Sequence, residues 1–128
     1  MVSKKITRLV LERDAYRCVI AGPDCIGVAS CPDHRAGRGS GGDPKRVLDD
    51  PANLIAACGV CNGRKEDATG PWAEDLIRRG VRVLRKGQRA EQIMTRVRAT
   101  PVEYPDRLWW QLESDGSRTT YISAGGAA

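Results

Sequence analysis

The stretch that decides the fold is Asn53-Leu-Ile-Ala-Ala-Cys58-Gly-Val-Cys61-Asn62-Gly-Arg-Lys65. It opens with an apolar run, which predicts a short buried segment leading into the two cysteines. The pair Cys58-x-x-Cys61 is a tight knuckle whose two sulfurs can reach one metal ion. Asn62 follows the second cysteine directly, and we expect it to open a helix that runs through residue 67. A metal site and the start of a helix are therefore expected at one point of the chain.

Four of the five cysteines are predicted to form a structural zinc site. Cys18 and Cys25 lie upstream of the knuckle formed by Cys58 and Cys61, and four thiolates around Zn²⁺ form a closed tetrahedral site. The remaining cysteine, Cys31, is expected to be a small buried side chain in a strand, or else to replace Cys25 as a ligand. The chain shows no secretion signal, so we expect a reducing compartment in which disulfides are disfavoured. A thiol redox role is the competing interpretation of the knuckle.

The composition predicts one soluble domain that needs help to hold its fold. The chain has 128 residues, no phenylalanine, 5% aromatic residues and 14 glycines, so apolar bulk for a core is scarce. A structural zinc contributes on the order of 10 kcal/mol of apparent folding free energy in small fingers and would compensate. No apolar run approaches the ~20 residues of a membrane helix, so we expect a cytoplasmic protein without membrane contact.

The charge predicts a polyanionic partner. The formal net charge is +5, and most of the 21 basic residues are arginine, which binds phosphate through a forked two-bond geometry. DNA contacts are expected from the glycine-rich loop, from the helix after the knuckle and from the basic segment 78–98: Arg35, Arg64, Lys65, Arg78 and Arg82. The alternative for each is a solvated surface charge. The three tryptophans are expected to supply the missing core aromatics rather than to stack on bases: Trp72, Trp109 and Trp110.

The knuckle divides the chain into an expected core, residues 1–68, and an extension, residues 69–123, that belong to one compact unit. The elements expected in the core are a helix at 3–14, a strand at 28–34 and a basic, glycine-rich loop at 35–46. Those expected in the extension are a helix from 70 to at least 79, with Gly80 either ending it or tolerated inside it, a helix around 90–97 that stops before Pro101, and a β-hairpin of 107–111 with 119–123. Residues 124–128 are expected to be a disordered tail.

Several short motifs combine into one pattern. Asp33-His34 ends the expected strand, Asn53-Leu54 opens the deciding stretch, and the knuckle is followed by Asn62 and Lys65. With Gly41-Gly42 between them, these motifs resemble the HNH endonuclease family, of the kind that carries a structural zinc. Arg13-Asp14-x-Tyr16-Arg17-Cys18 is similar to the start of small bacteriophage HNH proteins.

The resemblance covers about residues 8–67, half of the chain, and has asparagine at position 62, which makes the pattern an H-N-N variant. It implies an α+β fold with a small ββα-metal core and a four-cysteine zinc site. This core is flanked by an N-terminal helix and by a C-terminal helical arm plus β-hairpin.

The resemblance also implies a role for each polar residue of the pattern. His34 is the general base, Asp33 and Asn62 hold a catalytic divalent ion, and Asn53 holds the His34 loop through hydrogen bonds to backbone. The chemistry of these side chains agrees. An imidazole with an unperturbed pKa of ~6.5 takes a proton from water near neutral pH. Carboxylate and amide oxygens are hard ligands that suit Mg²⁺ or Mn²⁺.

The hypothesis that follows is a metal-dependent endonuclease that hydrolyses phosphodiester bonds in double-stranded DNA. The resemblance to phage proteins suggests genome packaging beside a terminase, or homing, in the cytoplasm of a bacterial host. One such site cuts one strand at a time, so a double-strand break needs a second subunit, sequential nicks or another nuclease. The alternatives are a zinc-stabilised DNA-binding module without cleavage activity, and a protein whose C-terminal arm docks on a larger machine. Binding alone does not need Asp33, His34, Asn53 and Asn62 together, and this favours cleavage.

Overall fold

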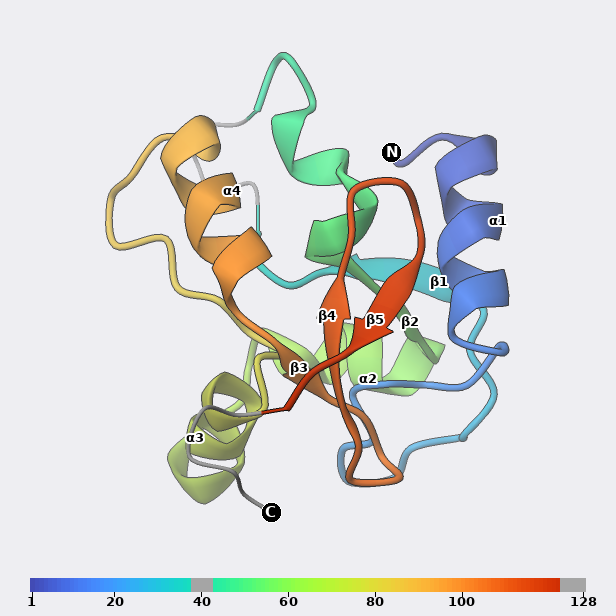
Figure 1. Ribbon diagram of the computed structural model, residues 1–128. Coiled ribbons are helices and arrows are strands. Elements are labelled where there is room, and N and C mark those ends of the chain that lie inside the picture. The colour runs from blue at the N-terminus through green and yellow to red at the C-terminus, as the bar shows by residue number, and fades with distance from the viewer. Residues whose placement is uncertain (38–42, 123–128) are drawn as a thin grey trace.

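The computed structural model describes residues 1–37 and 43–122, which form an α+β fold with two small sheets (Figure 1). The α+β class agrees with the sequence prediction. Gly41-Gly42 and the expected tail at 124–128 lie outside the described residues. Within the described ranges, no helix is both long and apolar enough to cross a membrane.

A two-stranded antiparallel hairpin carries the centre of the expected site. Its strands are β1 (Cys31–His34) and β2 (Leu54–Ala57), and all four β2 side chains are buried. Between the two strands the chain makes two short 3-10 turns, η1 (Val47–Asp49) and η2 (Pro51–Asn53). β1 is shorter than the expected strand because Val28 forms a bridge with Arg17 and the Ala29 N–H donates to the Tyr16 carbonyl at 2.8 Å, so residues 28 and 29 pair with the segment after α1. Before them, the sulfur of Cys25 accepts a hydrogen bond from the backbone N–H of Gly27 at 3.3 Å.

Helix α1 (Lys4–Arg13) packs against both strands of this hairpin, close to its predicted bounds (Figure 1). It begins at Ser3, whose hydroxyl accepts from the backbone N–H of Ile6 at 3.2 Å, an N-cap that satisfies a free donor of the first turn. Asp14 ends the helix as a buried carboxylate. It accepts from the Ala56 N–H at 3.0 Å and from the Tyr104 hydroxyl at 2.5 Å, and so joins α1 to β2 and to the C-terminal part of the chain.

Helix α2 (Gly59–Lys65) follows β2 directly. The expectation that Asn62 opens this helix is wrong, because Cys58 is its N-cap and the Sγ of Cys58 accepts from the Cys61 N–H at 3.4 Å. A cysteine sulfur thus takes the capping role that Ser or Asp usually performs. Asn62 lies inside the helix as a result.

The extension contains two helices and a second sheet. Its elements are α3 (Gly70–Arg78), α4 (Ala90–Ala99), β3 (Val102–Glu103), β4 (Trp109–Leu112) and β5 (Arg118–Thr120). The predicted hairpin is confirmed as β4 paired with β5, and β3 adds a third strand that the sequence did not predict. Gly80 ends α3, with φ +74°, and a Cβ at that position would lie 2.0 Å from the Pro101 carbonyl oxygen. Only glycine fits there.

One hydrophobic cluster contains side chains both from residues 1–68, such as Val19 and Ile55, and from the extension, such as Ile93 and Leu112. Trp72 and Trp110 pack against this core, the position expected for core aromatics. The guanidinium of Arg118 lies 3.9 Å above the Trp110 ring, a cation–π contact within the three-stranded sheet of β3, β4 and β5.

Candidate functional site

The four cysteines of the expected zinc site converge on one point. The Sγ atoms of Cys18, Cys25, Cys58 and Cys61 all lie within 4.8 Å of one another, so these residues could hold a metal ion such as zinc. Two come from the loop after α1 and two from the start of α2. Cys31 is not part of the group; its thiol donates to the Ala57 carbonyl oxygen at 3.4 Å from the start of β1.

Backbone donors surround these sulfurs. The Gly22 N–H donates to Cys61 Sγ at 3.3 Å, the Gly27 N–H donates to Cys25 Sγ at 3.3 Å, and the Cys61 N–H donates to Cys58 Sγ at 3.4 Å. Burial raises the pKa of the Cys58 thiol, but the backbone N–H groups at Cys61 and Ile26 outweigh it and bring this pKa to about 6. Burial raises the pKa of the Cys61 thiol. Cys58 and Cys61 are almost completely shielded from solvent, which disfavours a redox knuckle, since thiol exchange needs an accessible sulfur.

Asp33 and His34, at the end of β1, point to opposite sides of the hairpin. Successive strand residues alternate, so Asp33 faces α2 and His34 faces η1. His34 Nε2 lies 2.8 Å from Oδ1 of Asp49, and the two side chains are 19% and 5% exposed. This pairing was not foreseen, because Asp49 lies in a 3-10 turn that the sequence pattern did not predict. Arg46 also donates to Asp49, at 3.1 Å.

Asn53 fastens both sides of the His34–Asp49 pair. Its Oδ1 accepts from the Ala36 N–H at 2.9 Å, and its Nδ2 donates to the carbonyls of Ala36 at 3.0 Å and Leu48 at 2.9 Å. The side chain is fully buried. Ala36 lies two residues after His34 and Leu48 precedes Asp49, so one buried amide connects the segments that present both partners. These are hydrogen bonds to backbone, of the kind that the resemblance implies for Asn53.

On the other side of the hairpin, Asp33 is held by Lys65 of α2. Lys65 Nζ lies 2.6 Å from Asp33 Oδ2 and 2.6 Å from the His34 carbonyl oxygen. Burial raises the pKa of the Asp33 carboxyl, and the Lys65 ammonium opposes this shift. Asn62, one turn before Lys65 on the helix, donates from Nδ2 to the sulfur of Cys31 at 3.6 Å.

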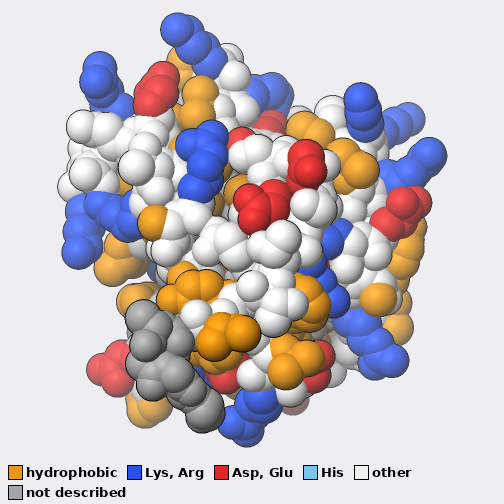
Figure 2. All heavy atoms as spheres, in the orientation of Figure 1, with side chains coloured by type: hydrophobic (Ala, Val, Ile, Leu, Met, Phe, Trp, Pro, Cys, Tyr) orange, Lys and Arg blue, Asp and Glu red, His pale blue; other side chains and the backbone are white. Residues whose placement is uncertain are grey.

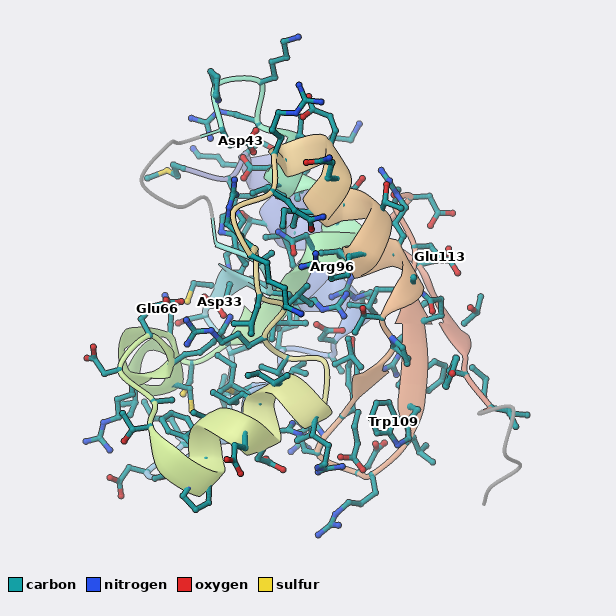
Figure 3. The ribbon with its side chains drawn as sticks, turned by 90° about the vertical axis from the view of Figure 1, so that its left-hand side faces the viewer. Asp33, Asp43, Glu66, Arg96, Trp109 and Glu113 are labelled. Atoms are coloured by element: carbon teal, nitrogen blue, oxygen red, sulfur yellow. The ribbon has the colours of Figure 1, made fainter. Side chains whose placement is uncertain are left out.

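Glu66 is a second residue that the sequence pattern did not single out. It caps the end of α2, and Figure 3 shows it on the same side of the molecule as Asp33. Its charge is one of the causes that raise the Asp33 pKa. The spacing Asn62-x-x-x-Glu66 was the available signal, since residues four apart lie on one face of a helix. Asp33 and Glu66 are therefore close enough for their charges to interact, and Asn62 lies on the same face of α2 as Glu66.

Two of the five expected DNA contacts are wrong, because both side chains are buried. Arg35 is 1% exposed and its guanidinium donates to carbonyl oxygens of the core and the extension, at Ala52, Gly80 and Thr100. Burial lowers its pKa to about 9. Lys65 is 1% exposed and is occupied by Asp33. A phosphate in solution reaches neither cation, and both act as internal ties.

The other three expected contacts lie at the surface, each next to an acid. Arg64 pairs with Asp24 at 2.7 Å, and Arg78 pairs with Asp75 at 2.9 Å and with Glu103 at 3.1 Å. Arg82 lies 3.8 Å from Glu66. These acids offset the positive charge that the sequence alone assigned to the surface, so the segment 78–98 is less cationic than its composition indicates.

The fold and the site were compared with known proteins. No protein-family model, no curated protein and no solved structure matches the chain.

Proposed function

We propose that the protein is a metal-dependent DNA endonuclease of HNH type. The observation that carries the proposal is the His34–Asp49 pair at the end of a two-stranded hairpin, fastened by the buried amide of Asn53. A histidine held at one nitrogen by a carboxylate, and still 19% exposed, is suited to accept a proton at its other nitrogen. A purely structural histidine does not need a separate buried side chain to fix both segments that present it.

Proton transfer in this proposal belongs to His34 and Asp49. With Nε2–H donating to Asp49, Nδ1 is the acceptor that takes the proton from the attacking water. The Asp49 carboxylate fixes this tautomer and stabilises the imidazolium that forms. Asn53 keeps the pair in place throughout.

The oxygens of Asp33 and Asn62 fit a hard divalent ion. In the ranges 1–37 and 43–122, Oδ1 of Asp33 and Oδ1 of Asn62 accept no hydrogen bond, while Lys65 occupies the other oxygen of Asp33. Mg²⁺ or Mn²⁺, which these oxygen types suit, would neutralise charge on the scissile phosphate and the leaving oxygen. Asp33 and Asn62 are the residues that would hold it.

The cysteine group is proposed to hold a structural zinc. Four sulfurs and no open position fit Zn²⁺ in a closed site. Such a site would join the loop that carries Cys18 and Cys25 to the start of α2, and so would fix the helix that carries Asn62. The proposal assigns separate metals to the soft and the hard ligands.

The second candidate is a zinc-stabilised DNA-binding module without cleavage activity. One observation favours it: the Lys65 ammonium already neutralises Asp33 at 2.6 Å, so this carboxylate is satisfied without a metal ion. The two candidates agree on zinc and on DNA and differ only in the reaction.

Plasmid cleavage decides between them. Supercoiled plasmid is incubated with the protein in Mg²⁺, in Mn²⁺ or without added divalent ion, beside His34→Ala. We expect nicked product that needs the ion and falls by about 10²–10⁴-fold in His34→Ala, the usual contribution of a general base. Asp24→Asn is the control, since Asp24 is an exposed acid that pairs with Arg64 rather than with His34. Folded protein that binds DNA and cuts none under every condition supports the binding module instead.

A further inference from the structure

A groove of about 610 Å³ runs between α1 and the His34 side of β1. Lys4, Arg8 and Tyr16 line one wall of this groove, and Pro32 and His34 line the other. It lies on the side of the hairpin opposite to Asp33 and Lys65. Among the residues that the structure describes, none of those that line the groove is acidic.

The cations of this groove differ from the other basic side chains discussed above. Lys4 and Arg8 are exposed, four residues apart on one face of α1, and neither forms an ion pair within the described part of the chain. Arg64, Arg78 and Arg82 are all next to acids. Figure 2 shows lysine and arginine side chains over α1 at the right-hand edge of the molecule, with an acidic side chain below them. Glu12 follows Arg8 by four residues on α1 but does not line the groove. Positive side chains along a groove attract a chain of phosphates.

Tyr16 adds an aromatic surface to the same groove. Tyr16 is 47% exposed. Two hydrogen bonds fix its backbone: the Tyr16 N–H donates to the Leu11 carbonyl at 2.8 Å, and the Tyr16 carbonyl accepts from the Ala29 N–H at 2.8 Å. The ring is therefore presented from a well-defined backbone. An exposed aromatic ring beside basic side chains is the arrangement on which single-stranded nucleic acids stack their bases.

We propose that this groove binds a single strand of DNA next to the scissile phosphate, with Lys4 and Arg8 on backbone phosphates and a base stacked on Tyr16. The groove, about 610 Å³, is large enough to take a nucleotide. Stacking on Tyr16 requires a base that has left its own stack. The inference rests on the proposed function for the place of the cut, and it changes the substrate class from intact duplex to DNA with an unpaired strand, such as a gap, flap or frayed end.

Binding is tested without cleavage. Fluorescence anisotropy is measured for the full chain without added divalent ion, with a labelled 20-nucleotide poly(dT) strand and with a duplex of the same length, each checked for integrity on a gel. We expect tighter binding of the single strand. Tyr16→Leu should weaken it on the order of tenfold, and Tyr16→Phe should keep it, because stacking needs only the ring. Lys4→Gln and Arg8→Gln should each weaken it and reduce the slope of log affinity against log salt by ~0.7.

Lys5→Gln is the matched control, because Lys5 is an equally exposed lysine of α1 that does not line the groove. Equal losses in Lys4→Gln and Lys5→Gln, or duplex preference with no effect of Tyr16→Leu, would overturn the inference. The same variants are run in the plasmid assay and on a duplex that carries a single-stranded gap. Groove-dependent binding with no cleavage of either substrate by any protein would leave the groove standing and remove the nuclease. Cleavage of the gapped duplex that ignores Lys4, Arg8 and Tyr16 would keep the nuclease and remove the groove.

Discussion

The cysteine group and the Asp33–His34 region sit at two ends of the same hairpin and are prepared for metal in different ways. The four sulfurs lie within 4.8 Å of one another with only backbone N–H donors among the contacts described above. Asp33 already has a cation, the Lys65 ammonium at 2.6 Å. The first site is complete as soon as a soft ion enters. The second has to share or release its internal cation before a hard ion binds.

This difference indicates what each site does for the protein. Four thiolates held this close repel one another, so a metal ion bound between them would contribute to folding. An aspartate neutralised by a lysine needs no metal to fold, so a divalent ion there would add chemistry rather than structure. Substitutions in each of the two regions test this difference.

The largest effect is expected from the cysteines. Cys58→Ser should remove bound zinc and unfold the protein, since structural zinc supplies on the order of 10 kcal/mol in small metal-bound folds. Cys31→Ser should keep both, because Cys31 lies outside the group. Zinc content by mass spectrometry and helicity by circular dichroism are the readouts. Loss of zinc in both variants would mean that the five cysteines act as one set.

The next effect concerns Lys65. Lys65→Met leaves the Asp33 carboxylate without its partner, 12% exposed, and removal of one member of a buried ion pair costs about 3–5 kcal/mol. Thermal unfolding should show this loss, and added Mg²⁺ should restore part of it. Arg64→Met, which breaks an exposed pair, should cost less than ~1 kcal/mol. No response to Mg²⁺ in Lys65→Met, or the same response after Asp33→Asn is added, would remove Asp33 from the ligand set.

A smaller, local effect is expected at Asp49. Asp49→Asn should change the tautomer of the His34 ring and lower cleavage on the order of 10–100-fold, the range for partners that orient a functional histidine. His34 is the single histidine of the chain, so ¹⁵N NMR reports its tautomer without assignment. Asp50→Asn is the control, because the neighbouring Asp50 carboxylate caps η2 through the Ala52 N–H rather than pairing with His34. An unchanged His34 spectrum in Asp49→Asn would show that the pair does not set the tautomer.

The sequence predicted the parts of this comparison that depend on local pattern. The spacing favoured Cys18, Cys25, Cys58 and Cys61, the four sulfurs that meet, but it left Cys31 open as an alternative to Cys25. The burial of individual charged side chains could not be predicted from the sequence. Nothing local distinguishes Arg35, whose guanidinium crosses to carbonyls of the extension, from an exposed arginine.

The same limit explains the missed partners. Asp49 reaches His34 across 15 residues only because η1 and η2 fold back over the hairpin. Lys65 reaches Asp33 across 32 residues because α2 folds back against the end of β1. The start of α2 was missed as well, since a cysteine N-cap gives no ordinary signal of a helix start.

The smallest effect concerns the tie between α1 and the extension, at Tyr104. Burial, and then the charge of Asp14, raise the pKa of the Tyr104 hydroxyl above its usual value near 10. Above that pH the unfolded chain loses the phenolic proton while the native chain keeps it. Stability should therefore fall as the pH rises past about 10, by up to ~1.4 kcal/mol per pH unit for this one proton. The Tyr104→Phe variant should be ~1 kcal/mol less stable at neutral pH, because the hydrogen bond is missing, and its stability should fall less steeply at alkaline pH.

Urea unfolding at pH 8, 10 and 11 measures the stability at neutral pH and its alkaline decline. Tyr121→Phe is the control, because Tyr121 lies at the surface. Parallel alkaline declines in the wild type and Tyr104→Phe would mean that the Tyr104–Asp14 contact does not persist in solution, and that the extension is held to α1 by apolar packing alone.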